Sequence, residues 1–138
     1  MEVLQIPKIE WDTLAKDAHV AVFGGGVPHG VIRYDYALVA VQDEIMQTYV
    51  TVREVTKDIV YWQYGGAFPP ARDTIKSYRG YEAMTEWTRE RYSEIFTLIE
   101  NTNTVMLKFA LHIGYRIIGV RNFDGEVLLE HRLDLKEG

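Results

Sequence analysis

The sequence predicts an α+β domain whose mixed, mostly antiparallel sheet is flanked by helices. Three β-rich runs follow one another with only two or three residues between them, which favours an antiparallel meander. A short apolar strand then lies between two helical segments, and a two-strand hairpin follows. The expected strands are residues 1–6, 36–42, 45–55, 59–64, 95–99, 115–121 and 126–135, and the expected helices are residues 8–17, 81–92 and 101–114.

The first strand is closed by Pro7, which cannot donate a backbone hydrogen bond. The helix that follows has three candidate buried side chains: Ile9, Trp11 and Leu14. Residues 20–31 contain Gly24-Gly25-Gly26 and a proline, so they predict a loop. The triple glycine lacks the Lys-Ser/Thr pair of a phosphate loop, which favours a turn.

The central strands are separated by Asp43-Glu44 and by residues 56–58, both of which are short enough for hairpin turns. The strand pattern stops after Gly65-Gly66, and Pro69-Pro70 marks a break before the next helix. In that helix, apolar positions recur at helical spacing and three glutamates face solvent. The buried set is Tyr81, Met84, Trp87 and Thr88, and the solvent-facing set is Glu82, Glu86 and Glu90.

The last helix has recognisable ends, because Asn or Thr can cap its start and Gly114 suits the left-handed position that terminates it. Its expected apolar stripe is Val105, Met106, Phe109 and Ile113. The preceding run, residues 95–99, is continuously apolar and predicts a strand buried on both faces. Residues 122–125 (NFDG) predict the final hairpin turn, and alternation along residues 127–135 predicts one buried face that includes His131.

Composition limits the function. The 138 residues carry a formal net charge of −5, which disfavours a nucleic-acid partner. The chain has no cysteine, so disulfides, thiolate nucleophiles and Cys-ligated zinc are excluded, and its four histidines lack ligand spacing, so no metal site is expected. No secretory signal and no membrane span is recognised. We expect residues 1–138 to form a single domain in the cytoplasm.

The carboxy-terminal third resembles the GCN5-related N-acetyltransferase (GNAT) superfamily. In FTLIENTNTVMLKFALHIGYRIIGVR, Asn103 stands where that family has a helix-opening Asn, and Gly114-Tyr115 takes the place of its Gly-Phe or Gly-Tyr. The meander also looks like the family's central hairpin, so the resemblance covers residues 36–135. It implies the acyl-CoA N-acyltransferase fold, with acetyl-CoA lying where the fourth and fifth strands separate.

The resemblance also implies the cofactor-binding residues. Pantetheine would pair with the backbone of the fourth strand, over residues 61–67, with Asn103 nearby. The candidate set is Tyr61, Gln63, Tyr64, Gly65, Gly66, Ala67 and Asn103. Asn103 also has a purely structural explanation, since a helix-capping Asn stabilises by about 1 kcal/mol relative to Ala.

The family's phosphate loop has Arg or Gln followed by spaced small residues, and this sequence departs from that pattern. In one register, residues 63–68 form the loop, with Phe68 where Gly or Ala is expected. In the other, Arg79-Gly80 is the remnant, and Glu82 and Met84 replace the glycines. A carboxylate among phosphate-binding amides opposes an anion.

The catalytic residues remain unassigned. Many family members have a tyrosine seven residues after the helix-opening Asn, but here that position is Ala110. Glu54 and Tyr64 lie in the region where members often place a base.

Two functions are therefore expected. One is an N-acetyltransferase acting on the primary amine of a small molecule or protein.

The other is a non-catalytic protein that resembles the GNAT-like proteins of tailed bacteriophages, with a structural, virion-associated or binding role. It would act in the host cytoplasm or the virion, through protein partners and with an oligomer allowed. In that case, Phe68 and Pro69-Pro70 are expected to fill the cleft.

Overall fold

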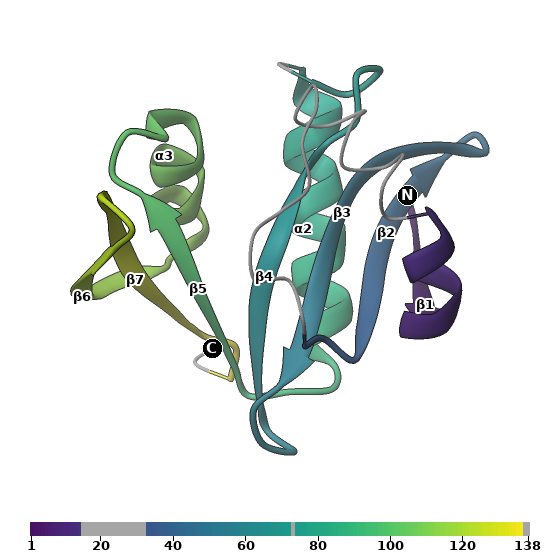
Figure 1. Ribbon diagram of the computed structural model, residues 1–138. Coiled ribbons are helices and arrows are strands. Elements are labelled where there is room, and N and C mark those ends of the chain that lie inside the picture. Colours follow the sequence, from purple (N-terminus) through teal and green to yellow (C-terminus); the bar gives the residue numbers. More distant parts are fainter. Residues whose placement is uncertain (15–32, 73, 137–138) are drawn as a thin grey trace.

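The computed structural model describes residues 1–14, 33–72 and 74–136 (Figure 1). These residues form a seven-stranded sheet with the strand order β1-β2-β3-β4-β5-β7-β6. The strands are β1 (Glu2–Pro7), β2 (Tyr36–Gln42), β3 (Ile45–Glu54), β4 (Ile59–Ala67), β5 (Glu94–Glu100), β6 (Arg116–Phe123) and β7 (Glu126–Asp134). Only β4 and β5 pair in parallel among these strands, as the helical connection between them requires. The predicted α+β class and mixed, mostly antiparallel sheet are confirmed.

Two hairpin turns have the backbone that short antiparallel connections need. Asp43 and Glu44 have φ angles of 53° and 65°, and Asp124 and Gly125 have φ angles of 51° and 81°. Positive φ at both central residues matches the right-handed twist of the flanking strands. The predicted meander and the predicted final hairpin are therefore both present.

Helix α2 (Ile75–Arg89) and helix α3 (Thr104–Ile113) lie on the same face of the sheet and contact each other through aromatic rings. The ring centroids of Tyr81 and Phe109 are 5.0 Å apart. The α2 side chains predicted to be buried pack into this core, while the three glutamates on its other face are exposed. This face carries the larger core, which continues from β2 to the end of β7.

The opposite face has a smaller core around Trp11, which is 1% exposed and lies in a helical segment at residues 8–14. Tyr49 and Phe68 pack with it, their ring centroids 5.6 Å apart. Ile9 was expected to be buried but is 80% exposed. It lies two positions before Trp11, so its side chain points to the opposite side of the helix. Leu14 is also half exposed, so that prediction is wrong too.

The ends of α3 are as predicted. Asn103 Oδ1 accepts a hydrogen bond from the Met106 N–H at 3.3 Å, and Gly114 terminates the helix with φ 114°. The buried stripe of α3, however, differs from the predicted one. Met106, Phe109, Ala110 and Ile113 face the core, whereas Val105 is 70% exposed because it lies about 100° around the helix from Met106.

In β5 and β7, the observed burial can be compared with the predicted burial. In β5, Ile95 and Ile99 are buried on the helix face, but the side chains between them are only partly covered, so this strand is not buried on both faces. In β7, His131 is fully buried, and its Nδ1 lies 2.8 Å from the Leu129 carbonyl oxygen, as expected for a packed histidine. None of the helices in the described part of the chain is long and apolar enough to cross a membrane.

Candidate functional site

The site begins where β4 and β5 separate. Their parallel pairing runs from Ile59 opposite Glu94 to Trp62 opposite Thr97 and then stops. At this last step, the Thr97 hydroxyl donates to the Trp62 carbonyl at 2.9 Å. Beyond it the two strands diverge toward the end of the molecule at which α2 begins (Figure 1).

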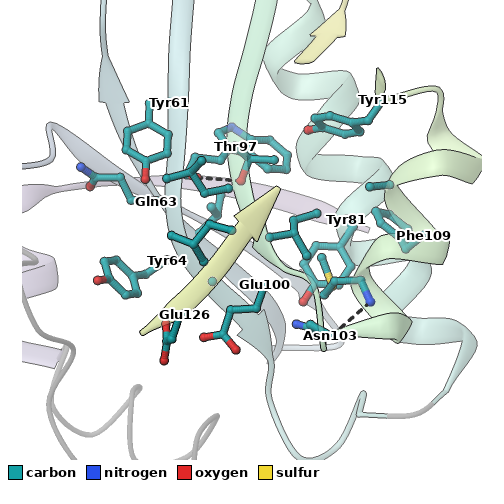
Figure 2. A pocket seen from close by; sticks show the side chains of 18 of the residues that line it. Tyr61, Gln63, Tyr64, Tyr81, Thr97, Glu100, Asn103, Phe109, Tyr115 and Glu126 are labelled. Atoms are coloured by element: carbon teal, nitrogen blue, oxygen red, sulfur yellow. Dashed lines mark hydrogen bonds between the residues drawn. The ribbon is translucent and has the colours of Figure 1, made fainter. Parts of the chain in front are cut away.

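A cavity of about 580 Å³ occupies this divergence, which is within the usual size of a small-molecule site. Figure 2 shows Tyr61, Gln63 and Tyr64 of β4 along one side and Tyr81, Phe109 and Tyr115 along the other. Its lining residues are Tyr49, Val50, Tyr61, Trp62, Gln63, Tyr64, Gly65, Tyr81, Thr97, Leu98, Ile99, Glu100, Asn103, Met106, Phe109, Ala110, Tyr115, Phe123, Asp124, Glu126 and Leu128. The cavity therefore draws its walls from both faces of the sheet.

The β4 wall is shaped by a β-bulge. Val50 pairs with Gly65, and Val52 pairs with Trp62, so Gln63 and Tyr64 together oppose the single residue Thr51. Immediately after the bulge, β4 approaches β3 closely. A Cβ placed on Gly65 would lie 2.4 Å from the Tyr49 carbonyl oxygen, so only glycine fits there.

The helix side of the cavity is apolar and carries two neutral phenols. Met106 and Phe109 of α3 supply apolar surface beside Ala110. Burial raises the pKa of Tyr81 and the pKa of Tyr115 well above the usual tyrosine value, so both keep their protons at neutral pH. Both tyrosines therefore present neutral hydroxyl groups to the cavity.

The mouth of the cavity is acidic. Glu100 at the end of β5, Asp124 in the β6–β7 turn and Glu126 at the start of β7 all line it. Figure 2 shows the side chains of Glu100 and Glu126 next to each other. A hydrogen bond with Glu100 and the negative charge of that residue raise the pKa of Glu126. Like charges held together in this way favour a cation at the mouth.

Five of the seven predicted cofactor-binding residues line the cavity: Tyr61, Gln63, Tyr64, Gly65 and Asn103. Gly66 and Ala67 do not, because β4 continues through them and pairs them with Tyr49 and Thr48 of β3. The expected end of the strand at Gly65-Gly66 was therefore wrong. Gly65 allows β4 to pack closely against β3, and neither glycine lies in a loop.

Neither predicted phosphate-loop register forms a loop of free amides. In the first, Phe68 is buried on the opposite face of the sheet, and the N–H groups of Ala71 and Arg72 both donate to its carbonyl oxygen. In the second, Gly80 lies inside α2, where an added Cβ would be 2.5 Å from Thr48 Oγ1. Phe68 lies outside the lining of the cavity, as do the two prolines after it, so the expected filling of the cleft by these residues is wrong.

The start of α2 still favours an anion. The described part of its first turn has no acidic residue, and Thr74 Oγ1 caps the Lys76 N–H at 3.1 Å. Arg72, Lys76 and Arg79 lie at or beside this end and are exposed. Helix N-termini attract negative charge, and these cations add to that attraction.

Two further residues considered from the sequence lie elsewhere. Glu54 accepts a hydrogen bond from the Tyr92 hydroxyl at 2.6 Å and is not in the cavity lining. Ala110 is in the lining, but it has no proton to give. The triple glycine at 24–26 falls outside the described residues. Tyr115 and the acidic mouth were missed as site residues, because only the fold brings them to the cleft.

No family model matches the sequence, and no curated protein matches it. Solved structures do resemble it. The ribosomal-protein-S18-alanine N-acetyltransferase of Escherichia coli superposes with a TM-score of 0.76 at 11% identity, covering 99% of this chain and 95% of that one. Arabidopsis thaliana Naa50, in complex with the bisubstrate analogue CoA-Ac-MVNAL, gives 0.71 at 13% identity, covering 97% and 99%. The protein yncA of Salmonella typhimurium, with its cofactor acetyl-CoA, gives 0.65 at 11% identity, covering 99% and 95%. The chain thus has the fold of the GNAT acetyltransferases.

Proposed function

We propose that the protein is an N-acetyltransferase that moves an acetyl group from acetyl-CoA to a primary amine. The observation that carries this proposal is the cavity between the separating strands β4 and β5, in a chain with the GNAT fold. Two of the similar structures hold acetyl-CoA or a CoA-containing bisubstrate analogue, which supports acetyl-CoA as the acyl donor.

The residues present fit such a donor. The apolar α3 wall suits the pantetheine arm, and β4 lines the cavity from Tyr61 to Gly65, past the point where its pairing with β5 ends. The pyrophosphate would lie near the start of α2, where Lys76 and Arg79 replace part of the attraction that a glycine loop would supply. If side-chain cations hold the pyrophosphate in place of backbone amides, the affinity for acetyl-CoA should fall as the salt concentration rises.

The acceptor is a cationic amine, carried by a small molecule or by a protein. Its ammonium form is attracted to Glu100, Asp124 and Glu126 at the mouth of the cavity. Glu126, which lies beside Glu100, then removes a proton, and its raised pKa makes it a better base than an ordinary carboxylate. The charge of the mouth also disfavours an acidic acceptor.

The transfer needs one further proton. The neutral amine attacks the thioester carbonyl carbon, the C–N bond forms, the C–S bond breaks and the CoA thiolate leaves. Five tyrosines line the cavity, among them Tyr81 and Tyr115, and the hydroxyl of one of these two protonates the thiolate. Replacing the acting tyrosine with Phe should lower kcat by about 10²-fold or more and leave KM nearly unchanged.

A CoA-release assay tests the proposal directly. Acetyl-CoA and a panel of amines are incubated with the protein, and free CoA is followed with a thiol reagent. Because the chain has no cysteine, the protein adds no thiol signal of its own. Amine-dependent release, strongest for polycationic acceptors, is the expected result. An absence of release with every amine, at acetyl-CoA concentrations that saturate binding, would reject the enzyme.

The second candidate is a non-catalytic GNAT-like protein with a binding or virion-associated role. The loop before α2 favours it, because Pro69 and Pro70 lack N–H groups and the next two amides are bonded within the turn. This candidate predicts neither CoA release nor acetyl-CoA binding, and it would act through protein partners. The enzyme would work in the cytoplasm, where acetyl-CoA is available.

A further inference from the structure

Thr51 lies at the centre of the bulge that separates β4 from β5. Its side chain is buried, with 4% exposure, and it faces the two-residue segment Gln63-Tyr64 across the β3–β4 ladder. The Tyr64 N–H donates to Thr51 Oγ1 at 3.2 Å, and Thr51 Oγ1 donates to the Tyr64 carbonyl oxygen at 3.4 Å. One hydroxyl therefore pairs both backbone groups of a residue in the bulge.

Few side chains can make this pair of bonds. A hydroxyl has one donor and two acceptor lone pairs, so it can replace the peptide partner that the bulge removes from the ladder. Without it, the N–H and C=O of Tyr64 would lose these partners in a mostly buried region, which is unfavourable. The strand would then relax toward a regular ladder, in which the extra residue is shifted along β4.

The position of the bulge matters for the cleft. The β4–β5 pairing ends at Trp62, the residue directly before the bulge, and Gly65 directly after it is drawn against the Tyr49 carbonyl. The bulge thus turns β4 toward β3 at the point where it leaves β5. The residues that it places, Gln63 and Tyr64, form one wall of the cavity.

We propose that Thr51 is a positioning residue: its hydroxyl holds the β4 bulge and so sets the opening between β4 and β5. The consequence for acetyl-CoA rests on the proposed function. The consequence for the backbone of β4 does not, and the two can be measured separately.

The test compares Thr51→Val, which keeps the side-chain shape and removes the hydroxyl, with Thr51→Ser, which keeps the hydroxyl. Thr88→Val is the matched control, because Thr88 is also a buried threonine whose hydroxyl bonds a backbone carbonyl, but it lies in α2 outside the cavity lining. Two quantities are followed in each protein: the hydrogen-exchange rate of the Tyr64 amide and the Kd for acetyl-CoA.

In the wild type, we expect the Tyr64 amide to exchange slowly. In T51V it should exchange at least tenfold faster, and Kd should rise at least tenfold. T51S should restore both quantities to within about threefold, and T88V should change neither. The inference is overturned if the wild-type amide already exchanges as an unprotected one. It is also overturned if T51V leaves that rate unchanged, or if T51S and T88V weaken binding as much as T51V does.

Failure of the proposed function would look different. If the wild type binds no acetyl-CoA, the amide exchange of T51V, compared with that of the wild type and of T51S, still decides whether the Thr51 hydroxyl holds the bulge. If T51V does not fold, an unprotected Tyr64 amide in the wild type still overturns the inference.

Discussion

Asn103 shows how one residue can be placed by a structural need and lie in a functional position at once. Its Oδ1 caps α3 through the Met106 N–H, and the residue also lines the cavity. The cap could be predicted from the sequence, because an Asn before an apolar helix is a known signal. Its place beside the cleft came from the family resemblance and not from the cap.

The two roles of Asn103 separate in a pair of substitutions. Asn103→Ala should cost about 1 kcal/mol of stability and lower Tm by about 3 °C, because it removes the cap. Asn103→Ser keeps a capping oxygen and should keep Tm, yet weaken acetyl-CoA binding by about fivefold through the lost amide contact. Thermal denaturation and titration measure the two effects. A serine variant with wild-type affinity would leave Asn103 with the capping role alone.

Glu126 gives a pH dependence with a definite sign. Because Glu100 raises its pKa, the folded protein holds this proton more tightly than the unfolded chain does. The contribution of Glu126 to stability therefore falls as the pH rises from the usual glutamate value through the raised pKa. Glu126→Gln should raise Tm at about pH 7 and lose that advantage at about pH 3.5, where the Glu126 carboxyl is protonated.

Thermal melts at the two pH values check this, with the exposed Glu82→Gln on α2 as the control. E82Q should show no comparable pH-dependent gain. A gain from E126Q that is equal at both pH values would mean that Glu126 and Glu100 do not interact. The same variant should raise KM for a cationic amine, since it removes one charge from the mouth of the cavity.

At the level of elements, helix α2 approaches β3 closely at Gly80. An added Cβ on Gly80 would lie 2.5 Å from Thr48 Oγ1 and 2.7 Å from Thr48 Cγ2. Both atoms belong to a fully buried side chain that has little room to move. Gly80 therefore serves helix packing, which explains why it is not part of a phosphate loop.

Gly80→Ala should destabilise the protein by about 2 kcal/mol, since overpacking outweighs the better helix propensity of alanine. In a Thr48→Ala background, the two closest atoms are gone and only the Cβ of residue 48, at 3.1 Å, stays near, so the same substitution should cost much less. Denaturant unfolding of the four proteins in this double-mutant cycle measures the coupling. An equal cost in both backgrounds would show that the contact with Thr48 is not its cause.

The elements themselves could largely be predicted, because hydrophobic period, caps and turn residues are local signals. The features that were predicted wrongly depend on contacts with other parts of the chain. Gly65 and Gly66 have the composition of a loop, but pairing with β3 extends β4 through them. Val105 has the right spacing for a buried stripe, but the direction of the apolar face was set by contacts of α3 with Tyr78 and Tyr81.

For the whole molecule, the cleft is a property of strand pairing over a long range. It depends on a bulge between β3 and β4, on the end of the β4–β5 ladder and on a hairpin turn that brings Asp124 and Glu126 to the same cavity. None of these leaves a periodic pattern, so only the resemblance to GNAT proteins predicted where acetyl-CoA would lie. The resemblance did not predict the acidic residues at the mouth of the cavity.

The most direct test of this account is a calorimetric titration of the protein with acetyl-CoA, repeated on one variant that fills the cleft. Leu98→Trp adds a bulky ring to the cavity lining, and Ile118→Trp makes a similar change at an exposed position of the edge strand β6. We expect binding in the micromolar range for the wild type and for I118W, and at least tenfold weaker binding for L98W. No heat and no thermal stabilisation of the wild type at millimolar acetyl-CoA would contradict the proposed acetyltransferase.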